Sequence, residues 1–319
     1  MALQGPRIVM AHLMDKVKDF EISKGISADM LIRQMRESGG FTAKNLAIGV
    51  DILEEMLKDH DSLNFLSFPA CIMATGTRGI IREIVKREWF SVIVTTCGTL
   101  DHDLARCYRE YYQGDFFMDD WELHRKGVHR IGNVLVPRES YGEIIEAEML
   151  KFLKELKSEG KKTLATYELC WELGKRLNES SFLYWCWKNE IPVIVPGITD
   201  GAVGYQIWQF SQENDLKIDI LKDEQLLSDL VWNAKKSGAL IIGGGISKHH
   251  VLWWNQFKNG LDYAVYITTA VEYDGSLSGA RPREAISWGK IMEKAQTVTI
   301  EADATVVLPL IFAALLERI

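Results

Sequence analysis

The sequence predicts an α/β fold in which a doubly wound, Rossmann-like parallel sheet carries helices on both faces and a helical N-terminal extension. From about residue 68 onward, short apolar runs alternate with segments of helical periodicity. Strands that are apolar throughout are typical of parallel sheets covered by helices. Glycines and acids follow several of these runs, as they do at the carboxyl ends of strands in open α/β sheets. No linker rich in Pro, Gly or Ser divides the chain, so we expect one domain over residues 1–319.

The expected elements follow the periodicity of apolar residues along the chain. Residues 1–60 form the helical extension, in which the range 42–58 repeats apolar residues at helical spacing. Strands are expected at 70–73, 92–95, 193–195, 239–242, 264–268 and 297–300. Helices are expected at 79–88, 141–158, 202–211, 223–236, 248–257, 281–289 and 304–318. The apolar run 304–316 contains Pro309 and is too short to span a bilayer, so we interpret it as a core helix.

Composition and charge exclude several classes of protein. The chain has 47% hydrophobic and 25% charged residues, and its net charge of −7 includes no block of like charges. Because a nucleic-acid-binding protein carries a basic face, this balance argues against that class and leaves a cationic substrate open. The N-terminus lacks the pattern of a signal peptide. We therefore expect a cytoplasmic protein that binds neither nucleic acid nor membrane.

The cysteines and one short acidic triplet bear on metals and disulfides. The five cysteines include no CxxC pair, so neither structural zinc nor a disulfide framework is expected. They are interpreted as reduced thiols. Asp101, His102 and Asp103 resemble a set of metal ligands, but nothing else in the sequence supports one. No metal is expected.

Several expected strands end in segments suited to an anionic ligand. These segments are Thr96-Cys97-Gly98, Thr199-Asp200-Gly201 and Gly243-Gly244-Gly245, and Thr75-Gly76 also precedes a helix. Glycine at such points lets backbone N–H groups approach a phosphate, whose charge the start of the following helix favours. The GxGxxG fingerprint of a standard Rossmann dinucleotide site is absent. The pattern alone leaves a nucleotide site and ligand-free tight turns equally open.

The segment 284–290 contains a candidate nucleophilic amine. Lys290 follows Trp288 and Gly289, and Glu284 lies six residues before it. A lysine attacks carbon only as the free amine, so its surroundings must lower its pKa. Trp288 could supply an apolar wall, and Gly289 could supply the bend that turns Lys290 into a cleft. Taken alone, the segment is more typical of a surface lysine at a helix end, where a cation suits the helix dipole.

Five longer segments give the chain a family resemblance. In order, they are RIGNVLVP (130–137), PVIVPGITDGAVG (192–204), GALIIGGGISKHH (238–250), DYAVYITTAVEYDGSLSGARPREAISWGK (262–290) and EADATVVLPL (301–310). Together they resemble deoxyhypusine synthase of a prokaryotic or archaeal type, from about residue 70 to the C-terminus. The resemblance implies a Rossmann-like subunit in a homotetramer with active sites at dimer interfaces.

The resemblance also implies an NAD-dependent transferase of hypusine biosynthesis. Members of the family oxidise spermidine with bound NAD and carry its aminobutyl fragment as an imine on an active-site lysine. They pass the fragment to one lysine of the translation initiation factor 5A precursor and reduce the new imine with the retained hydride. The expected cofactor is therefore NAD, and the expected partners are a polyamine and that factor.

The functional residues of the family match positions in this chain. Lys290 matches the imine-carrying lysine, and His249 matches the proton-transfer histidine, a residue type that titrates in the useful range. Residues expected to bind the amine are Glu284, Trp288, Tyr266 and Asp101. Residues expected to bind the cofactor are Asp200, Gly243, Gly244, Thr269, Asp274, Gly275, Asp303, Thr75 and Thr96.

Several residues in these segments also have a purely structural interpretation. Asp200 and Asp303 could be helix N-caps, because each lies just before an expected helix. His250 is interpreted as structural, and Trp253 and Trp254 are interpreted as packing residues rather than stacking platforms.

Three departures from the eukaryotic pattern leave the identity of the amine open. Leu277, Tyr205 and His102 stand where eukaryotic members typically carry acids. Losing carboxylates near a polycation costs affinity, since charge-assisted hydrogen bonds are the strong kind. A homospermidine-synthase-like enzyme that acts on small amines is therefore an alternative, and a non-catalytic NAD-binding paralogue is another. Retention of Lys290 and His249 argues against the paralogue.

Overall fold

A six-stranded sheet lies at the centre of the computed structural model, which describes residues 16–319. All neighbouring strands in this sheet are parallel. The strands are β1 (Ser62–Ser67), β2 (Val92–Val94), β7 (Val193–Ile194), β9 (Lys236–Ile242), β10 (Leu261–Thr268) and β11 (Ile291–Glu301). Their order across the sheet is β11-β10-β9-β1-β2-β7. The order reverses between β1 and β9, so a doubly wound sheet of this kind has its ligand crevice at the carboxyl ends of those two strands.

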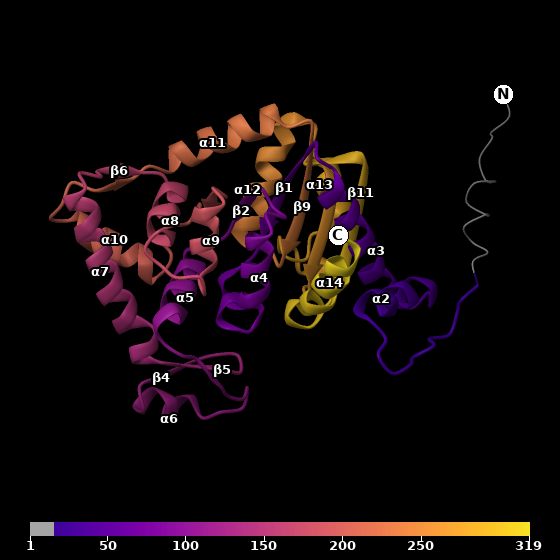
Figure 1. The fold of residues 1–319 in the computed structure, drawn as a ribbon, viewed down its shortest axis with the longest axis horizontal. Helices are drawn as coiled ribbons and strands as arrows, with labels where there is room; N and C mark the ends of the chain where they lie inside the picture. Colours follow the sequence, from indigo (N-terminus) through magenta and orange to yellow (C-terminus); the bar gives the residue numbers. More distant parts are fainter. Residues whose placement is uncertain (1–15) are drawn as a thin grey trace.

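Helices cover both faces of the sheet, as Figure 1 shows. Side chains alternate between the faces along each strand. In β9, Leu240 and Ile242 join one apolar cluster, whereas Ala239 and Ile241 join another. Helices over the first cluster include α4 (Thr77–Lys86) and α14 (Ala304–Arg318), and helices over the second are α11 (Ile220–Asn233), α12 (Gly245–Asn255) and α13 (Pro282–Ser287). The predicted doubly wound α/β fold is confirmed.

The N-terminal extension is helical, as predicted, from residue 28 onward. It consists of α2 (Ala28–Glu37) and α3 (Phe41–Lys58), which pack on each other and on α14. Residues 16–27 form no helix, and residues 1–15 of the predicted extension lie outside the described residues. The buried guanidinium of Arg318 fastens the end of α14 to this extension. It pairs with Asp29, with Asp51 at 2.8 Å and with Glu54 at 3.0 Å.

The strand predicted at 70–73 is wrong. Ala70–Ala74 is a 3-10 turn, η1, and the strand lies earlier, at β1. β1 escapes the apolar pattern because Asn64 and Ser67 interrupt it, although both side chains are buried. The amide of Asn64 donates to the carbonyl of Met56 at 3.3 Å. Pro69 then separates the strand from η1, because proline has no N–H to offer a sheet.

The other predicted elements are present with small shifts at their ends, and several further elements appear. α7 (Gly142–Ser158) and α10 (Ala202–Ser211) match their predicted ranges closely. The helices that periodicity did not predict are α5 (Cys97–Tyr108), α8 (Thr166–Gly174) and α9 (Phe182–Lys188). The short additional elements are the pair β6 (Thr163–Leu164) and β8 (Lys217–Ile218), and the 3-10 turns η2 (Arg138–Ser140), η3 (Gln256–Lys258) and η4 (Glu272–Asp274).

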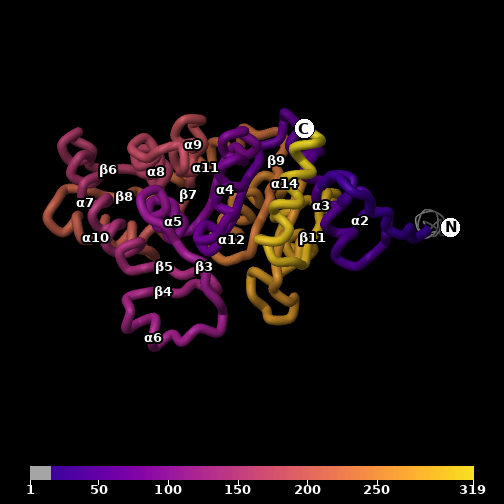
Figure 2. The backbone as a smooth tube through the Cα atoms, turned by 60° about the horizontal axis from the view of Figure 1, so that its bottom comes forward, coloured from indigo at the N-terminus to yellow at the C-terminus, as the bar shows by residue number. Residues whose placement is uncertain are grey.

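A small ribbon projects from the body of the molecule (Figures 1 and 2). It pairs β3 (Tyr112–Gln113), β5 (Val134–Pro137) and β4 (Val128–Ile131) antiparallel, in that order, and carries α6 (Asp120–Arg125).

The C-terminal helix is a core helix, as predicted. α14 contains Pro309 and buries Leu308, Ile311 and Leu315. Within residues 16–319, no helix combines the length and the apolar character needed to cross a membrane.

Candidate active site

The carboxyl ends of β1 and β9 form the two walls of a crevice. β1 leads through η1 into α4, and β9 leads through Gly243 and Gly244 into α12. The walls lie against each other, because a β-carbon on Gly243 would be 3.5 Å from Cγ of Pro69. α4 begins after Gly76 and α12 after Gly244, and neither helix has a side-chain cap. In α4 the N–H groups of Thr77, Arg78 and Gly79 already donate to Thr75 and Gly76. The first turn of α12 is therefore the one suited to hold an anion.

The predicted cofactor-binding residues all follow carboxyl ends of strands and lie along one edge of the sheet. In the order of the strands across the sheet they are Asp200, Thr96, Thr75, Gly243, Gly244, Thr269, Asp274, Gly275 and Asp303. Six strands set about 4.8 Å apart make this edge about 24 Å wide. Only an extended ligand could contact residues from both ends of it.

Two acids at this edge already have local partners. Asp303 caps α14 and accepts a hydrogen bond from the N–H of Thr305 at 2.9 Å, so its helix-cap interpretation is confirmed. Asp274 accepts from the N–H of Ser276 at 2.7 Å, and its hydrogen bonds with Ser276 lower the pKa of its carboxyl. Asp200 is not a cap, because Gly201 precedes α10 without any side-chain hydrogen bond. All three acids are exposed.

The turn that ends α13 places Lys290. Gly289 adopts a φ of 68°, and the N–H of Lys290 donates to the carbonyl of Ala285 at 3.0 Å. This left-handed turn, common at helix ends, brings Lys290 back over the end of the helix. Nζ of Lys290 lies 5.3 Å from the centre of the Trp288 ring. The bend expected at Gly289 is therefore present, and it sets the lysine beside an indole.

His249 lies one turn into α12 and is coupled to Lys290. Burial, and then the positive charge of Lys290, lower the pKa of His249. The ring of His249 stacks on Trp253, with 5.9 Å between centroids and 22° between planes. Trp253 also packs edge-on against Phe257, so its half-exposed indole fits the packing interpretation. His249 is therefore a base within electrostatic reach of the amine of Lys290.

Glu284 and Tyr266 lie at different depths near this pair. Glu284 is exposed in the first turn of α13. Tyr266, on β10, is only 1% exposed, and its phenol oxygen is buried without a hydrogen-bond partner. Burial, and then the charge of Glu284, raise the pKa of Tyr266. Within the protomer Glu284 can reach a ligand, whereas Tyr266 belongs to the apolar cluster behind α12 and α13.

Asp101, which was expected beside the amine, lies on α5. Its carboxylate is fully buried against the start of α10. Its carboxylate accepts hydrogen bonds from Oη of Tyr141 at 2.7 Å and from the N–H groups of Ala202 and Val203 at 2.9 and 2.8 Å. Burial raises the pKa of this carboxyl, while these donors lower it. Asp101 therefore joins α5 to α10 just after Asp200, and it presents no exposed oxygen in the protomer.

His102 and Asp103 contact different partners from Asp101, so these three side chains do not converge as metal ligands. Nδ1 of His102 lies 2.9 Å from Oη of Tyr111. Burial, and then the charge of Arg106, lower the pKa of His102 to about 4. The imidazole is therefore neutral near pH 7, whereas the acid expected from the eukaryotic pattern would be charged.

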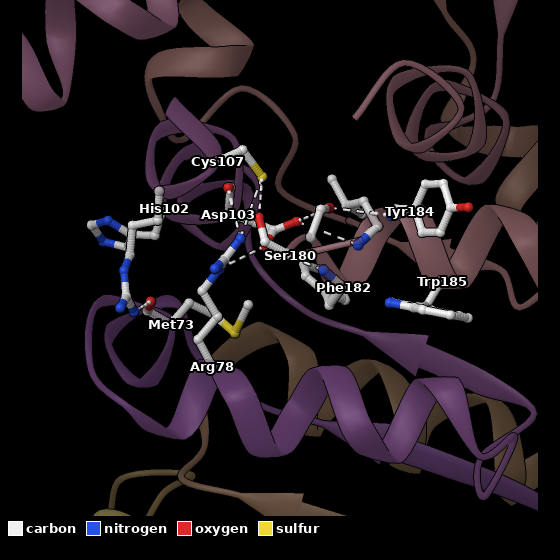
Figure 3. Close-up of polar contacts among 12 residues, drawn as sticks. Met73, Arg78, His102, Asp103, Cys107, Ser180, Phe182, Tyr184 and Trp185 are labelled. Carbon is white, nitrogen blue, oxygen red and sulfur yellow. Dashed lines mark hydrogen bonds and ion pairs between the residues drawn. The ribbon is translucent and has the colours of Figure 1, made fainter. Parts of the chain in front are cut away.

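Two arginines that the sequence analysis did not single out stabilise the η1 side of the crevice, and Figure 3 shows one of them, Arg78, beside Asp103. Nη1 of Arg106 donates to the carbonyls of Met73 and Thr75, at 2.9 and 2.6 Å. Nε of Arg78 donates to the buried Asp103 at 2.8 Å, and Asp103 also accepts backbone N–H groups at the start of α9. A buried arginine in a helix has the same sequence pattern as an exposed one, so no local signal marks these residues.

The other two departures from the family pattern lie on different elements. Tyr205 is exposed on α10 and packs on Trp208 with 5.6 Å between ring centroids. Leu277 is half-buried in the loop between β10 and α13. Trp254 donates to Glu224 at 2.6 Å, and His250 lies 3.3 Å from the same carboxylate, which fits their structural interpretation.

Comparison with known proteins identifies the family of the chain. The sequence model of the deoxyhypusine synthase family matches residues 30–315. A probable deoxyhypusine synthase from Picrophilus torridus is 56% identical over 96% of this chain and 98% of its own length. Another, from Thermoplasma acidophilum, is 53% identical over 94% of this chain and 97% of its own length.

A solved structure adds support for the fold. The crystal structure of a candidate deoxyhypusine synthase from Entamoeba histolytica superimposes with a TM-score of 0.64, at 21% identity, over 93% of this chain and 96% of its own. The family match extends over most of the sequence, and relatives more than half identical to it align almost end to end. The chain therefore belongs to the deoxyhypusine synthase family of enzymes.

Proposed function

We propose that this protein is an NAD-dependent deoxyhypusine synthase. In this proposal it transfers the 4-aminobutyl group of spermidine to one lysine of the translation initiation factor 5A precursor through an imine on Lys290. The observation that carries the proposal is the placement of Lys290, whose Nζ lies 5.3 Å from the Trp288 ring and whose charge acts on His249. Membership of the family supports the same assignment.

Lys290 is the proposed nucleophile. A primary amine attacks an imine carbon only when it is uncharged. Trp288 shields one side of Nζ from water, and His249, with its lowered pKa, is a neutral base that can take the proton. Attack by Nζ on the oxidised carbon of spermidine forms the new C–N bond and expels diaminopropane as the leaving amine.

The acceptor lysine then displaces Lys290 by the same chemistry. Its amine attacks the imine carbon, Nζ of Lys290 leaves, and the aminobutyl group is now an imine on the factor. His249 can return a proton to the departing Nζ. Glu284, exposed at the start of α13, can hold the terminal ammonium of the fragment throughout.

NAD is the proposed cofactor, and the residues of the crevice fit it. The chemistry that NAD supplies, when bound, is the reversible removal of a hydride from the carbon beside the secondary amine of spermidine. The first turn of α12 lacks a side-chain cap at the point where doubly wound sheets bind dinucleotides, so its N–H groups can hold the diphosphate. Asp303 or Asp274, both exposed, can accept from ribose hydroxyls.

The proposal includes a homotetramer with active sites at dimer interfaces. α12, η3 and α13 carry exposed apolar side chains around the site, namely Ile246, Trp253, Phe257 and Trp288. An exposed apolar patch of this size is typical of a contact surface. A second copy packed there would exclude water from Lys290, which the protomer leaves half-exposed.

Aminobutyl transfer between small amines, as in a homospermidine-synthase-like enzyme, is the second candidate function. The buried state of Asp101 and the neutrality of His102 favour it. The protomer offers a polyamine fewer carboxylates than the family pattern provides, so the amine could differ. The surroundings of Lys290 suit both reactions.

Borohydride trapping separates these proposals. The enzyme is incubated with NAD and labelled spermidine, with and without the factor, and the products are reduced and mapped by peptide mass spectrometry. Deoxyhypusine synthase gives an adduct on Lys290 and moves the label to the factor. The small-amine enzyme gives the same adduct but moves the label only to a small product. No adduct on Lys290 in the presence of both NAD and amine would contradict both and favour a non-catalytic paralogue.

A further inference from the structure

Lys248, next to His249 on α12, is a fully buried lysine that the proposed chemistry does not use. Its side chain is 1% exposed and is among the largest buried side chains of the described chain. Lysine is almost never buried to this degree without a partner of opposite charge. Its surroundings therefore need an explanation.

The ammonium of Lys248 has two close neighbours, and neither is a carboxylate. Nζ donates to the backbone carbonyl of Ala280 at 2.8 Å. It also lies 4.1 Å from the centre of the Tyr266 ring, a distance at which the ring face attracts a cation. The Tyr266 hydroxyl has no partner, so Tyr266 serves Lys248 through its face.

This arrangement costs stability. Burial, and then the charge of Arg281, lower the pKa of Lys248 to about 8, while Glu284 acts in the opposite direction. Moving an ammonium out of water is unfavourable, and an apolar side chain of similar volume in such a site is often neutral or stabilising. A methionine would fill the same space without this cost.

The carbonyl of Ala280, which accepts the hydrogen bond from Lys248, lies where the loop after β10 meets α13. Ala280 ends the loop from β10 and directly precedes Arg281, the N-cap of α13. The loop is also pressed against the start of α12, since a β-carbon on Gly244 would lie 2.5 Å from Cα of Ser278. α13 then carries Glu284, and the turn after it places Lys290. A single hydrogen bond from Lys248 therefore connects the helix of His249 to the start of the segment that bears the nucleophile.

We propose that Lys248 is a positioning residue: by binding the carbonyl of Ala280 it fixes α13 against α12 and so sets Lys290 relative to His249. This role rests on the proposed function of that pair. The hydrogen bond from Lys248 to Ala280 can be tested without any reaction, because it should slow backbone hydrogen exchange in residues 281–290.

The test compares Lys248→Met with Lys258→Met in the full chain. Lys258 is a matched control, since it also donates to backbone carbonyls, including that of Trp232 at 2.8 Å, from η3, the turn that directly follows α12. Three quantities are measured: the melting temperature, backbone hydrogen exchange over 276–290, and the rate of adduct trapping on Lys290 with NAD and spermidine. Lys248→Met is expected to melt at or above the wild-type temperature, to exchange at least tenfold faster over 281–290, and to trap at least tenfold more slowly. Lys258→Met is expected to keep both rates within about twofold.

The opposite results overturn the proposal. Wild-type exchange over 281–290 in Lys248→Met would show that this hydrogen bond does not hold α13, and wild-type trapping would show that it does not set the nucleophile. If Lys258→Met sped up hydrogen exchange over 281–290 and slowed trapping as much as Lys248→Met, the effect would reflect only a general loosening around α12. Should Lys248→Met fail to fold, the shorter and polar Lys248→Gln takes its place with the same expectations. A wild-type enzyme that gives no adduct would contradict the proposed function, whereas the exchange comparison would still decide the role of Lys248.

Discussion

The carboxylate of Asp101 accepts a 2.8 Å hydrogen bond from the N–H of Val203, although the two residues lie 102 positions apart in the chain. The bond joins the helix after β2 to the helix after β7, at the edge of the sheet that carries the candidate cofactor residues. Asp101 thus shapes the site by holding backbone, and in the protomer it does so without an oxygen free for an amine.

Asp101→Asn should therefore destabilise the fold and displace Asp200. An amide turns one acceptor oxygen into a donor that faces the N–H of Ala202 or Val203, and a buried group left unpaired costs about 1–3 kcal/mol. Urea unfolding measures this loss. Asp219→Asn is the control, because Asp219 caps α11 through Leu221 in a half-buried position and should cost less than about 1 kcal/mol. Equal losses in the two variants would contradict the structural role of Asp101.

His102 should make the protein sensitive to acid. Burial is the main reason that the pKa of His102 falls from 6.5 to about 4 in the folded protein. Between these two pH values the unfolded state therefore binds a proton that the folded state does not. Its contribution to stability is fully present above pH 6.5 and is lost as the pH falls toward 4, up to about 3 kcal/mol. His102→Asn, which can keep the contact with Tyr111, should flatten the unfolding free energy over this window. The exposed His129→Asn should leave the slope unchanged, and a similar slope in all three proteins would refute the assignment.

Arg106→Met should weaken NAD binding more than it slows catalysis. Arg106 holds the carbonyls of Met73 and Thr75, so its loss frees the η1 wall while leaving α12 and α13 in place. We expect the KM for NAD to rise at least fivefold and kcat to change less than twofold. Arg109→Met, at an exposed position at the end of the same helix, serves as the control. A fall in kcat with an unchanged KM would argue against this role.

Gly244→Ala should disrupt the crevice. The new β-carbon would lie 2.3 Å from Oγ and 2.5 Å from Cα of Ser278, so the backbone of one segment must move. Overpacking of this kind typically costs about 1–3 kcal/mol, and here it also moves the start of α12. Calorimetric titration should show at least tenfold weaker NAD binding. Gly142→Ala, at the start of α7 with open space around it, should leave binding intact.

Lys290→Arg should abolish adduct formation while leaving NAD affinity within about threefold. A guanidinium stays charged at accessible pH and cannot form the imine. Lys294→Arg, an exposed lysine on the following strand, should trap at the wild-type rate. Trapping in Lys290→Arg, with the adduct mapped to another lysine, would transfer the nucleophilic role to that residue.

The sequence predicted most of the sheet because most of its strands contain an uninterrupted apolar run, as in residues 239–242 of β9. Residues such as Leu240 and Ile241 face opposite clusters, yet both are buried, so the run shows no alternation. β1 was missed for the converse reason, since Asn64 and Ser67 are buried polar residues that look like a turn in the sequence. Asn64 is hydrogen-bonded inside the protein, whereas the hydroxyl of Ser67 is buried without a partner. Periodicity reports which side chains are apolar, and it cannot report which polar ones find partners.

The site was predictable where it depends on local sequence and unpredictable where it depends on distant contacts. The bend at Gly289 and the position of Lys290 beside Trp288 follow from four consecutive residues. The burial of Asp101 depends on α10, about a hundred positions later, and the clamp of Arg106 depends on η1. The stacking of His249 on Trp253 spans one helical turn, and only the structure shows that this packing lies at the exposed edge of α12.

The ion pairs of Arg318 affect the order in which parts of the chain can reach their folded state during synthesis. Its guanidinium is the counter-charge of three acids on α2 and α3, which leave the ribosome roughly three hundred residues earlier. Translation proceeds toward the C-terminus, so those first helices cannot pair with Arg318 until that residue has been added and has left the ribosome. Removing the last turn of α14, or fusing a bulky tag close to it, should therefore destabilise α2 and α3 more than the elements in the middle of the chain.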